Sequence, residues 1–196
     1  MKIFLKINQI TQLLNLAQEH PRDAALFHLA FCTGFRISDL LALKRTHLTD
    51  KQGEVVKVLR FKTKKTKKWL DKPLRDDCRR AIKDYLETRT DSNPYMFPPI
   101  QARSRYGLNS RGPMSRMSAH RLYKKYLSHF YSGSELAGAA THTCRRSIGK
   151  IISQETGRIE AAAAFLGHRS IASTQSYIDM NEFAEKANEV ALSVEY

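Results

Sequence analysis

Residues 33–43 read TGFRISDLLAL, and the predicted elements are arranged around this stretch. A largely apolar run over residues 24–32 precedes it and predicts a buried helix that ends at the glycine. The leucines that follow predict a short helix over residues 37–43. Arg36 therefore stands at the start of a helix, where free backbone N–H groups favour an anion. Its planar guanidinium suits a phosphate, but the stretch alone favours an ordinary ion pair with Asp39, three residues on.

Further helices are predicted on both sides by apolar residues at helical spacing. They are expected over residues 7–17, 74–88 and 118–131, with a series of short helices from residue 143 to residue 194. Residues 55–59 and 69–70 predict two strands of a hairpin around a lysine-rich turn. Residues 91–116 are rich in proline and glycine and predict a loop. We therefore expect a fold that is mainly α with a small antiparallel β-sheet.

The composition indicates a folded protein that meets a polyanion. The 196 residues contain 33 Lys and Arg against 19 Asp and Glu, a net charge of +14, and 42% of them are hydrophobic. This charge is typical of nucleic-acid-binding proteins, although an anionic membrane surface is the second candidate and charge alone does not choose. The three cysteines form no CxxC pair, which argues against a disulfide framework or a zinc site and fits a reducing compartment. We recognise no membrane-spanning run and no signal peptide, so a cytoplasmic protein is expected.

Two further motifs carry histidine. Residues 142–146 read HTCRR. In a helix, His142 and Arg145 would share a face and reach one anion, whereas the alternative is a solvated basic helix start. A Leu-Gly turn precedes His168, and Tyr177 follows nine residues later. A lone His or Tyr is usually a packing residue, but this spacing is uncommon by chance.

A run of lysines, KTKKTKK at residues 62–68, lies between the two predicted strands. A charge run is usually a solvated turn. The functional alternative is a β-turn that presses lysine against a DNA backbone.

These four motifs, in this order and at these spacings, resemble the catalytic domain of the tyrosine recombinases, the phage integrase family. The family pattern has an Arg after a Thr-Gly turn, a Lys in a β-hairpin, an H-x-L-R-H motif, and an LGH turn followed nine residues later by Tyr. The resemblance runs from about Phe4 to the C-terminus. It implies the family's fold and its activity, in which DNA is cleaved and rejoined at a specific site through a 3′-phosphotyrosine, during integration, excision or inversion. It also implies that neither a metal nor a cofactor takes part.

The resemblance further implies a role for each matching residue. Arg36 and Arg145 would clamp the scissile phosphate and stabilise its transition state. His142 and His168 would donate hydrogen bonds to the same phosphate, with His142 assisting the nucleophile. Tyr177 would attack, leaving a free 5′-hydroxyl.

A hairpin lysine would protonate the departing 5′ oxygen. Lys65 is expected to be this general acid, because the family places that lysine eight residues before a proline that closes the second strand, and Pro73 stands eight residues after Lys65. Lys62 and Lys64 remain alternatives in such a lysine-rich turn.

Three small departures from the family pattern leave the catalytic residue types intact. Cys144 stands where the family commonly has Leu, Arg146 where it commonly has His, and Asp39 where Glu is more usual. A larger departure is that the catalytic pattern begins almost at Met1. We therefore expect a single catalytic domain over residues 1–196, without the N-terminal core-binding domain of most integrases, as in short stand-alone invertases or an excised fragment.

The apolar stripe of residues 181–196 is expected to form a tail helix that docks on a neighbouring subunit or folds back on its own domain. DNA contacts are expected from the hairpin, the loop and the helix over residues 118–131. The residues concerned are Lys62, Lys64, Lys67, Arg103, Arg105, Arg121, Lys124 and Lys125. The last three could equally form the basic outer face of an ordinary amphipathic helix.

The expected partner is a double-stranded DNA target site. The protein is expected to be a homotetramer on DNA and a monomer or dimer without it. Accessory DNA-bending proteins are expected as further partners, and a membrane is not. A bacterial, phage or plasmid origin is expected. Two alternatives stay open, a type IB topoisomerase with similar chemistry and a DNA-binding regulator whose catalysis has lapsed.

Overall fold

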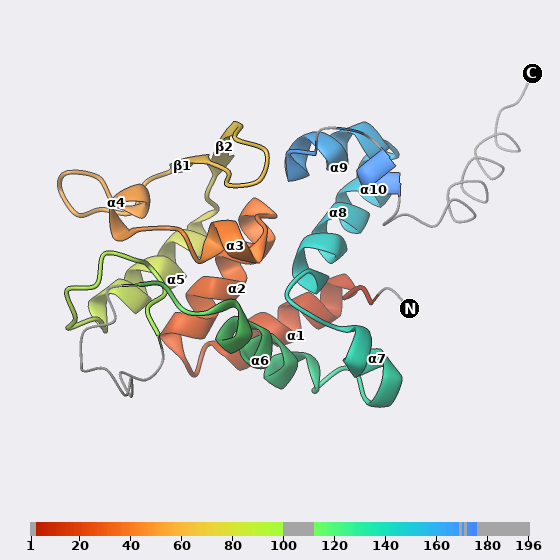
Figure 1. Cartoon of the computed structure of the whole chain (residues 1–196), viewed down its shortest axis with the longest axis horizontal. Helices are drawn as coiled ribbons and strands as arrows, with labels where there is room; N and C mark the ends of the chain where they lie inside the picture. The colour runs from red at the N-terminus through yellow and green to blue at the C-terminus, as the bar shows by residue number, and fades with distance from the viewer. Residues whose placement is uncertain (1–2, 100–111, 169, 171, 176–196) are drawn as a thin grey trace, which may run out of the picture.

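The computed structural model describes residues 3–99, 112–168, 170 and 172–175. Helices dominate, and two strands form one antiparallel sheet, so the expected fold class is confirmed (Figure 1). In chain order the elements are α1 (Ile7–Ala17), α2 (Pro21–Thr33), α3 (Ile37–Leu40), α4 (Arg45–Leu48), β1 (Val58–Lys62), β2 (Trp69–Pro73), α5 (Asp76–Glu87), α6 (Arg116–Leu127), α7 (Gly133–Gly138), α8 (Thr143–Thr156), α9 (Ile159–Leu166) and α10 (Ala172–Gln175).

Helix α2 lies at the centre of the fold because it is apolar on almost every side and must be covered all round. It packs against α1, α5 and α8. Phe27 in its middle contacts two tyrosines of α6, with ring centroids 4.9 Å from Tyr123 and 5.0 Å from Tyr126. The central helix therefore fixes the position of the segments that carry the motifs.

Gly34 ends α2 in the left-handed conformation, with φ of 62°. This position also allows a close approach, because a Cβ there would lie 2.6 Å from the Phe165 ring and 2.9 Å from Leu166. Only glycine combines the backbone angle with this lack of bulk. The end of α9 thereby reaches the beginning of α3.

The hairpin of β1 and β2 stands at the same end of the molecule as α9 (Figure 1). Its register pairs Val58 with Pro73 and Lys62 with Trp69. Side chains alternate, so Leu59 and Phe61 point into the core while their strand neighbours face outward.

The structure corrects the predicted helix over residues 37–43, since α3 ends at Leu40. The next residues turn because Leu43 and Lys44 pair with a distant segment. The Leu43 carbonyl accepts a hydrogen bond from the Met96 N–H at 2.7 Å, and Lys44 forms a β-bridge with Tyr95. These long-range backbone pairs override the local helical pattern.

The first strand begins later than predicted, at Val58, because Val55 forms an isolated bridge with Thr49 instead. Helix α6 covers residues 116–127 instead of 118–131, and α5 covers 76–87 instead of 74–88. The short helices α4 and α7 were not predicted, and α8, expected to be short, has 14 residues. None of the helices in the described parts of the chain combines the length and apolar character needed to cross a bilayer.

Candidate active site

Arg36 stands where its motif predicts, as the N-cap of α3, and its side chain is half-buried. A helix of four residues has only a weak dipole, so the guanidinium itself, more than the helix, provides attraction for an anion here. The alternative ion pair with Asp39 is not formed among the described residues.

Asp39 instead fixes the hairpin turn. Its carboxylate is 1% exposed and accepts a hydrogen bond from the backbone N–H of Lys64 at 2.8 Å. Within the turn, the hydroxyls of Thr63 and Thr66 lie 2.7 Å apart, and the Thr63 N–H donates to the Lys68 carbonyl. The turn that presents Lys65 is therefore tied both to itself and to α3.

His142 and Arg145 lie one helical turn apart at the beginning of α8, with His142 as the N-cap. Arg145 is 3% exposed, and its guanidinium donates to the Gly34 carbonyl and, at 2.8 Å, to the Leu166 carbonyl. It therefore connects the C-terminal ends of α2 and α9. The motif prediction placed this arginine on an anion but gave no sign of these two carbonyls.

His168 follows the left-handed Gly167, whose φ is 64°. A Cβ at Gly167 would lie 2.8 Å from Leu70 of the hairpin, so the glycine allows this turn to meet β2. The His168 ring is oriented by Thr174, whose hydroxyl lies 2.7 Å from Nδ1. Its backbone N–H donates to the Ala163 carbonyl.

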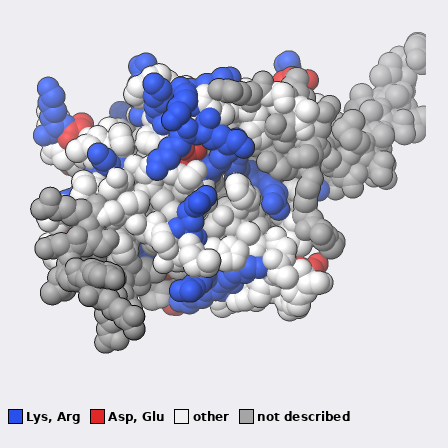
Figure 2. Space-filling view, viewed as in Figure 1, with Lys and Arg blue, Asp and Glu red and all other residues white. Residues whose placement is uncertain are grey.

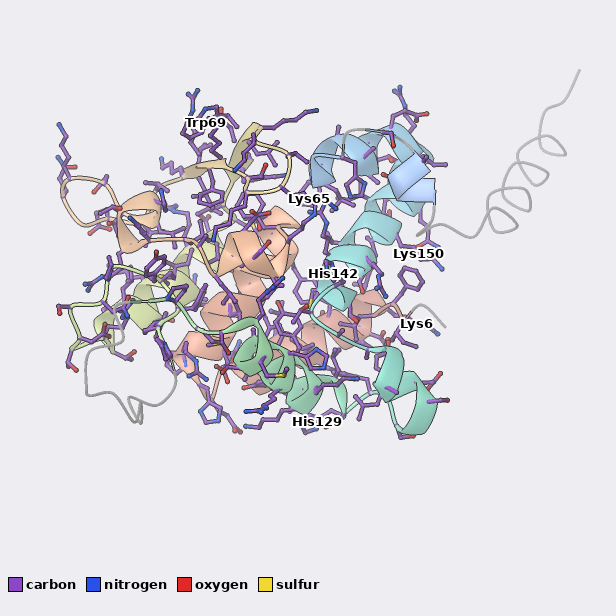
Figure 3. All side chains as sticks on the ribbon, in the orientation of Figure 1. Lys6, Lys65, Trp69, His129, His142 and Lys150 are labelled. Carbon is purple, nitrogen blue, oxygen red and sulfur yellow. The ribbon has the colours of Figure 1, made fainter. Side chains whose placement is uncertain are left out.

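The same cations lower the pKa of both His142 and His168. The pKa of His168 is lowered to about 4. Burial is the largest cause, followed by the positive charges of Arg145, Arg36 and Lys65. The pKa of His142 is lowered as well, by burial first and then by Arg146 together with these three cations. Because such effects fall off with distance, five predicted residues converge on one place. Figure 3 shows Lys65 and His142 at the junction between the hairpin and the start of α8.

Lys72 belongs to this region and was missed by the sequence prediction. It is 5% exposed, its ammonium donates to the Phe165 carbonyl, and it lies 3.9 Å from the centroid of the Phe165 ring. Burial, followed by the charge of Arg145, lowers its pKa to about 8. Together, Lys72 and Arg145 bind the last two carbonyls of α9, directly before the turn that carries His168. The strand alternation, which points residue 72 inward, was the available signal.

The predicted DNA-binding lysines of the hairpin are exposed at residues 62, 64 and 67. Lys and Arg gather over the hairpin and again over α6 on the face shown in Figure 2. On α6, Arg121 and Lys125 are exposed, but Lys124 is not, because its ammonium donates to the carbonyls of Leu136 and Ala137 at the end of α7. Lys124 therefore holds the end of α7, and its contact with DNA stays a prediction.

Several predicted residues lie outside the described residues, namely Arg103, Arg105, Tyr177 and the tail over residues 181–196. In the part of the chain that is described, no three His, Cys, Asp or Glu side chains gather as metal ligands would. Cys32, Cys78 and Cys144 are free thiols.

A sequence profile described as the phage integrase family matches residues 4–183. The chain belongs to this family. These tyrosine recombinases are enzymes that cleave and rejoin DNA in site-specific recombination.

Similar proteins agree with this membership. The chain is 28% identical over 182 residues to the probable integrase/recombinase YoeC of Bacillus subtilis (strain 168), covering 93% of this chain and 90% of YoeC. It is 28% identical over 159 residues to the tyrosine recombinase XerD of Xanthomonas campestris pv. campestris, covering 80% of this chain and 47% of XerD. This integrase-family chain therefore spans most of YoeC but about half of XerD.

The fold is also that of the family. The crystal structure of XerA recombinase matches with a TM-score of 0.73 at 21% identity, covering 100% of this chain and 67% of the XerA chain. Several other similar structures are recombinases or integrases in complex with DNA.

Proposed function

We propose that this chain cleaves and rejoins DNA at a specific site through a covalent 3′-phosphotyrosine at Tyr177. The proposal is carried by the placement of Arg36, Arg145 and Lys65, each of which is near enough to lower the pKa of both His142 and His168. This array offers positive charge and hydrogen-bond donors to a phosphodiester, whose transition state gains negative charge. Phosphoryl transfer depends mainly on such positioning and charge stabilisation.

In the proposed cleavage step, the Tyr177 oxygen attacks phosphorus and its proton passes to His142. The lowered pKa of His142 keeps the imidazole neutral near pH 7, so that it can accept this proton. The bond from phosphorus to the 5′ oxygen breaks, and Lys65 donates a proton to that oxygen. Rejoining reverses these transfers when a 5′-hydroxyl attacks the tyrosyl ester, so neither ATP nor a metal is consumed.

The two carbonyl bonds of Arg145 are compatible with a phosphate contact, because a guanidinium carries five N–H donors. These bonds hold the group in one orientation beneath the ends of α2 and α9. A preoriented donor loses little entropy when it meets the transition state.

The proposed partner is double-stranded DNA. The proposed contacts come from lysines 62, 64 and 67 of the hairpin, from Arg121, Lys124 and Lys125 of α6, and from Arg103 and Arg105, which precede α6 in the sequence. We also propose a homotetramer on DNA, linked by the tail over residues 181–196, with accessory DNA-bending proteins, in the cytoplasm of a bacterial, phage-borne or plasmid-borne system. The family match favours this reading over a type IB topoisomerase.

The test uses a nicked substrate that traps the covalent intermediate by releasing a short strand. Wild-type protein is expected to give a protein–DNA adduct that survives denaturation, and Tyr177→Phe is expected to give none. An adduct that persists in Tyr177→Phe would identify another nucleophile. Absence of an adduct in both proteins, with DNA binding intact, would favour a regulator without catalysis.

A further inference from the structure

Trp69 is unusual because a large aromatic side chain at the beginning of β2 is 58% exposed. It is the only tryptophan in the chain. The hairpin register places it on the outward face, opposite Lys62, while the inward face of the same strands enters the core. Exposed aromatic groups on a rigid element often mark a contact surface.

Two cations flank the ring. The Arg60 guanidinium carbon lies 5.5 Å from the Trp69 ring centroid, and the Lys62 ammonium lies 6.0 Å from it. Arg60 also lies 3.7 Å from Asp71, but both side chains are more than half exposed, so this pair is screened and weak. The outward face thus combines one aromatic surface with two available positive charges.

We propose that Trp69 contacts DNA within a few nucleotides of the scissile phosphate, with its ring on the deoxyribose surface between phosphates bound by Arg60 and Lys62. This inference rests on the proposed function. Aromatic rings between basic side chains hold single strands without reading their sequence. In a duplex the bases are stacked on one another, so the ring meets the sugar–phosphate backbone, to which most protein–DNA contacts are made.

The short separation between Trp69 and Lys65 limits how far along the DNA Trp69 can lie from the phosphate that meets Lys65. Four residues span at most about 14 Å, which is about four steps along a DNA strand at roughly 3.4 Å each. The Thr63–Thr66 and Thr63–Lys68 hydrogen bonds make the intervening turn compact. Figure 3 shows Trp69 and Lys65 on the same hairpin. DNA that brings a phosphate to Lys65 and follows the outward face of the hairpin would therefore meet Trp69 within a few nucleotides.

Charge favours DNA over a second copy of this protein as the occupant of the face. The chain carries a net charge of +14, and lysines 64, 65, 67 and 68 extend the positive surface from the outward face into the turn. A second copy would bring like charge against this surface, whereas DNA releases counterions when it binds there. An anionic membrane would also attract this positive surface, but the hairpin that carries the ring also presents Lys65, the proposed general acid of a reaction on DNA.

The test uses the 196-residue chain carrying Tyr177→Phe and a DNA duplex of mixed sequence, with and without a fluorescein label. Two measurements are made. Fluorescence anisotropy of the labelled DNA reports binding. Emission excited at the red edge of the absorption band, where tyrosine does not absorb, comes from Trp69, the only tryptophan. It is measured with unlabelled duplex and with acrylamide as a neutral quencher. We expect DNA to quench the emission and to protect the ring from acrylamide. We also expect Trp69→Ala to weaken DNA binding by about 5-fold or more, because the apolar surface that the ring buries on DNA is lost, with Trp69→Phe between Trp69→Ala and the wild type.

Ile7→Ala is the matched control, because Ile7 is an equally exposed apolar residue, at 59%, on α1. It should leave DNA affinity unchanged, and neither substitution should lower the melting temperature appreciably. DNA binding without any change at Trp69, and with Trp69→Ala as tight as wild type, would overturn the inference and leave the proposed function standing. No anisotropy change with DNA would overturn both. Protection from acrylamide by anionic phospholipid vesicles but not by DNA would make the face a membrane contact and overturn the inference.

Discussion

Asp39 connects the two halves of the candidate active site, because its buried carboxylate accepts the Lys64 N–H at 2.8 Å. Asp39 lies three residues after Arg36 in α3, and Lys64 lies directly before Lys65 in the hairpin turn. One hydrogen bond to a charged acceptor therefore fixes the distance between a proposed phosphate clamp and the proposed general acid.

Removal of this acceptor should impair proton donation more than DNA binding. Asp39→Ala is expected to slow adduct formation on the nicked substrate about tenfold or more, because a positioned general acid contributes about 10²–10⁴-fold. A substrate with sulfur in place of the bridging 5′ oxygen has a leaving group that needs no proton, and it should restore the rate of Asp39→Ala and Lys65→Ala alike.

Asp39→Asn keeps an acceptor oxygen and should lose less activity than Asp39→Ala. Arg36→Ala should gain nothing from the sulfur substrate, since its proposed role is charge stabilisation. If sulfur restores Lys65→Ala but leaves Asp39→Ala equally slow, Asp39 does not act through the hairpin lysine.

Lys72 should make folding stability depend on pH. Its pKa is about 8 in the folded protein and 10.5 in the unfolded chain. Between these values the unfolded chain binds the proton and the folded protein does not, so stability rises with pH through this window, by at most about 3 kcal/mol. Urea unfolding on both sides of pH 8 should therefore show a rise in wild type that Lys72→Met lacks.

Lys72→Arg is the control for this prediction, because it keeps a donor for the Phe165 carbonyl but stays charged throughout. It should lack the rise as well. Identical pH profiles for wild type and Lys72→Met would show that Lys72 does not titrate in this window.

Alanine substitutions at Gly34 and Gly157 should distinguish the cost of backbone strain from the cost of steric crowding. Both glycines have positive φ, but a Cβ at Gly34 would lie 2.6 Å from Phe165, whereas a Cβ at Gly157 meets nothing within 4 Å. Gly157→Ala should cost about 1–2 kcal/mol of unfolding free energy from its left-handed backbone alone. Gly34→Ala should cost about 1–3 kcal/mol more from overpacking against α9. Equal losses in chemical denaturation would mean that α9 moves aside freely.

The sequence predicted the residues whose placement depends on local structure. Arg36 and His142 stand at helix starts, and His168 follows a glycine turn, because glycines and helix boundaries are set within a few residues. The resemblance selected Lys65 from the lysine run, and the charge of Lys65 does act on both histidines. Its assignment as general acid remains a prediction.

Long-range contacts explain what was missed. The partner of Asp39 is 25 residues away, and the carbonyl bound by Lys72 is 93 residues away. Neither pair leaves a local pattern in the sequence. The same reason shortened α3, because Leu43, the last residue of the predicted helix, pairs with Met96, and Lys44, the next residue, pairs with Tyr95. The contact of Lys124 with the end of α7 was missed for this reason too.

The most direct test of the central claim is the single-turnover rate of covalent adduct formation by Arg36→Ala at saturating protein. Arg36 is half-buried, so its replacement should leave the fold and salt-sensitive DNA binding largely intact. We predict a loss of about 10²–10³-fold or more, as for the removal of one preoriented donor to a transition state. A rate close to that of wild type would contradict the account, because the converging cations would then not stabilise the phosphate.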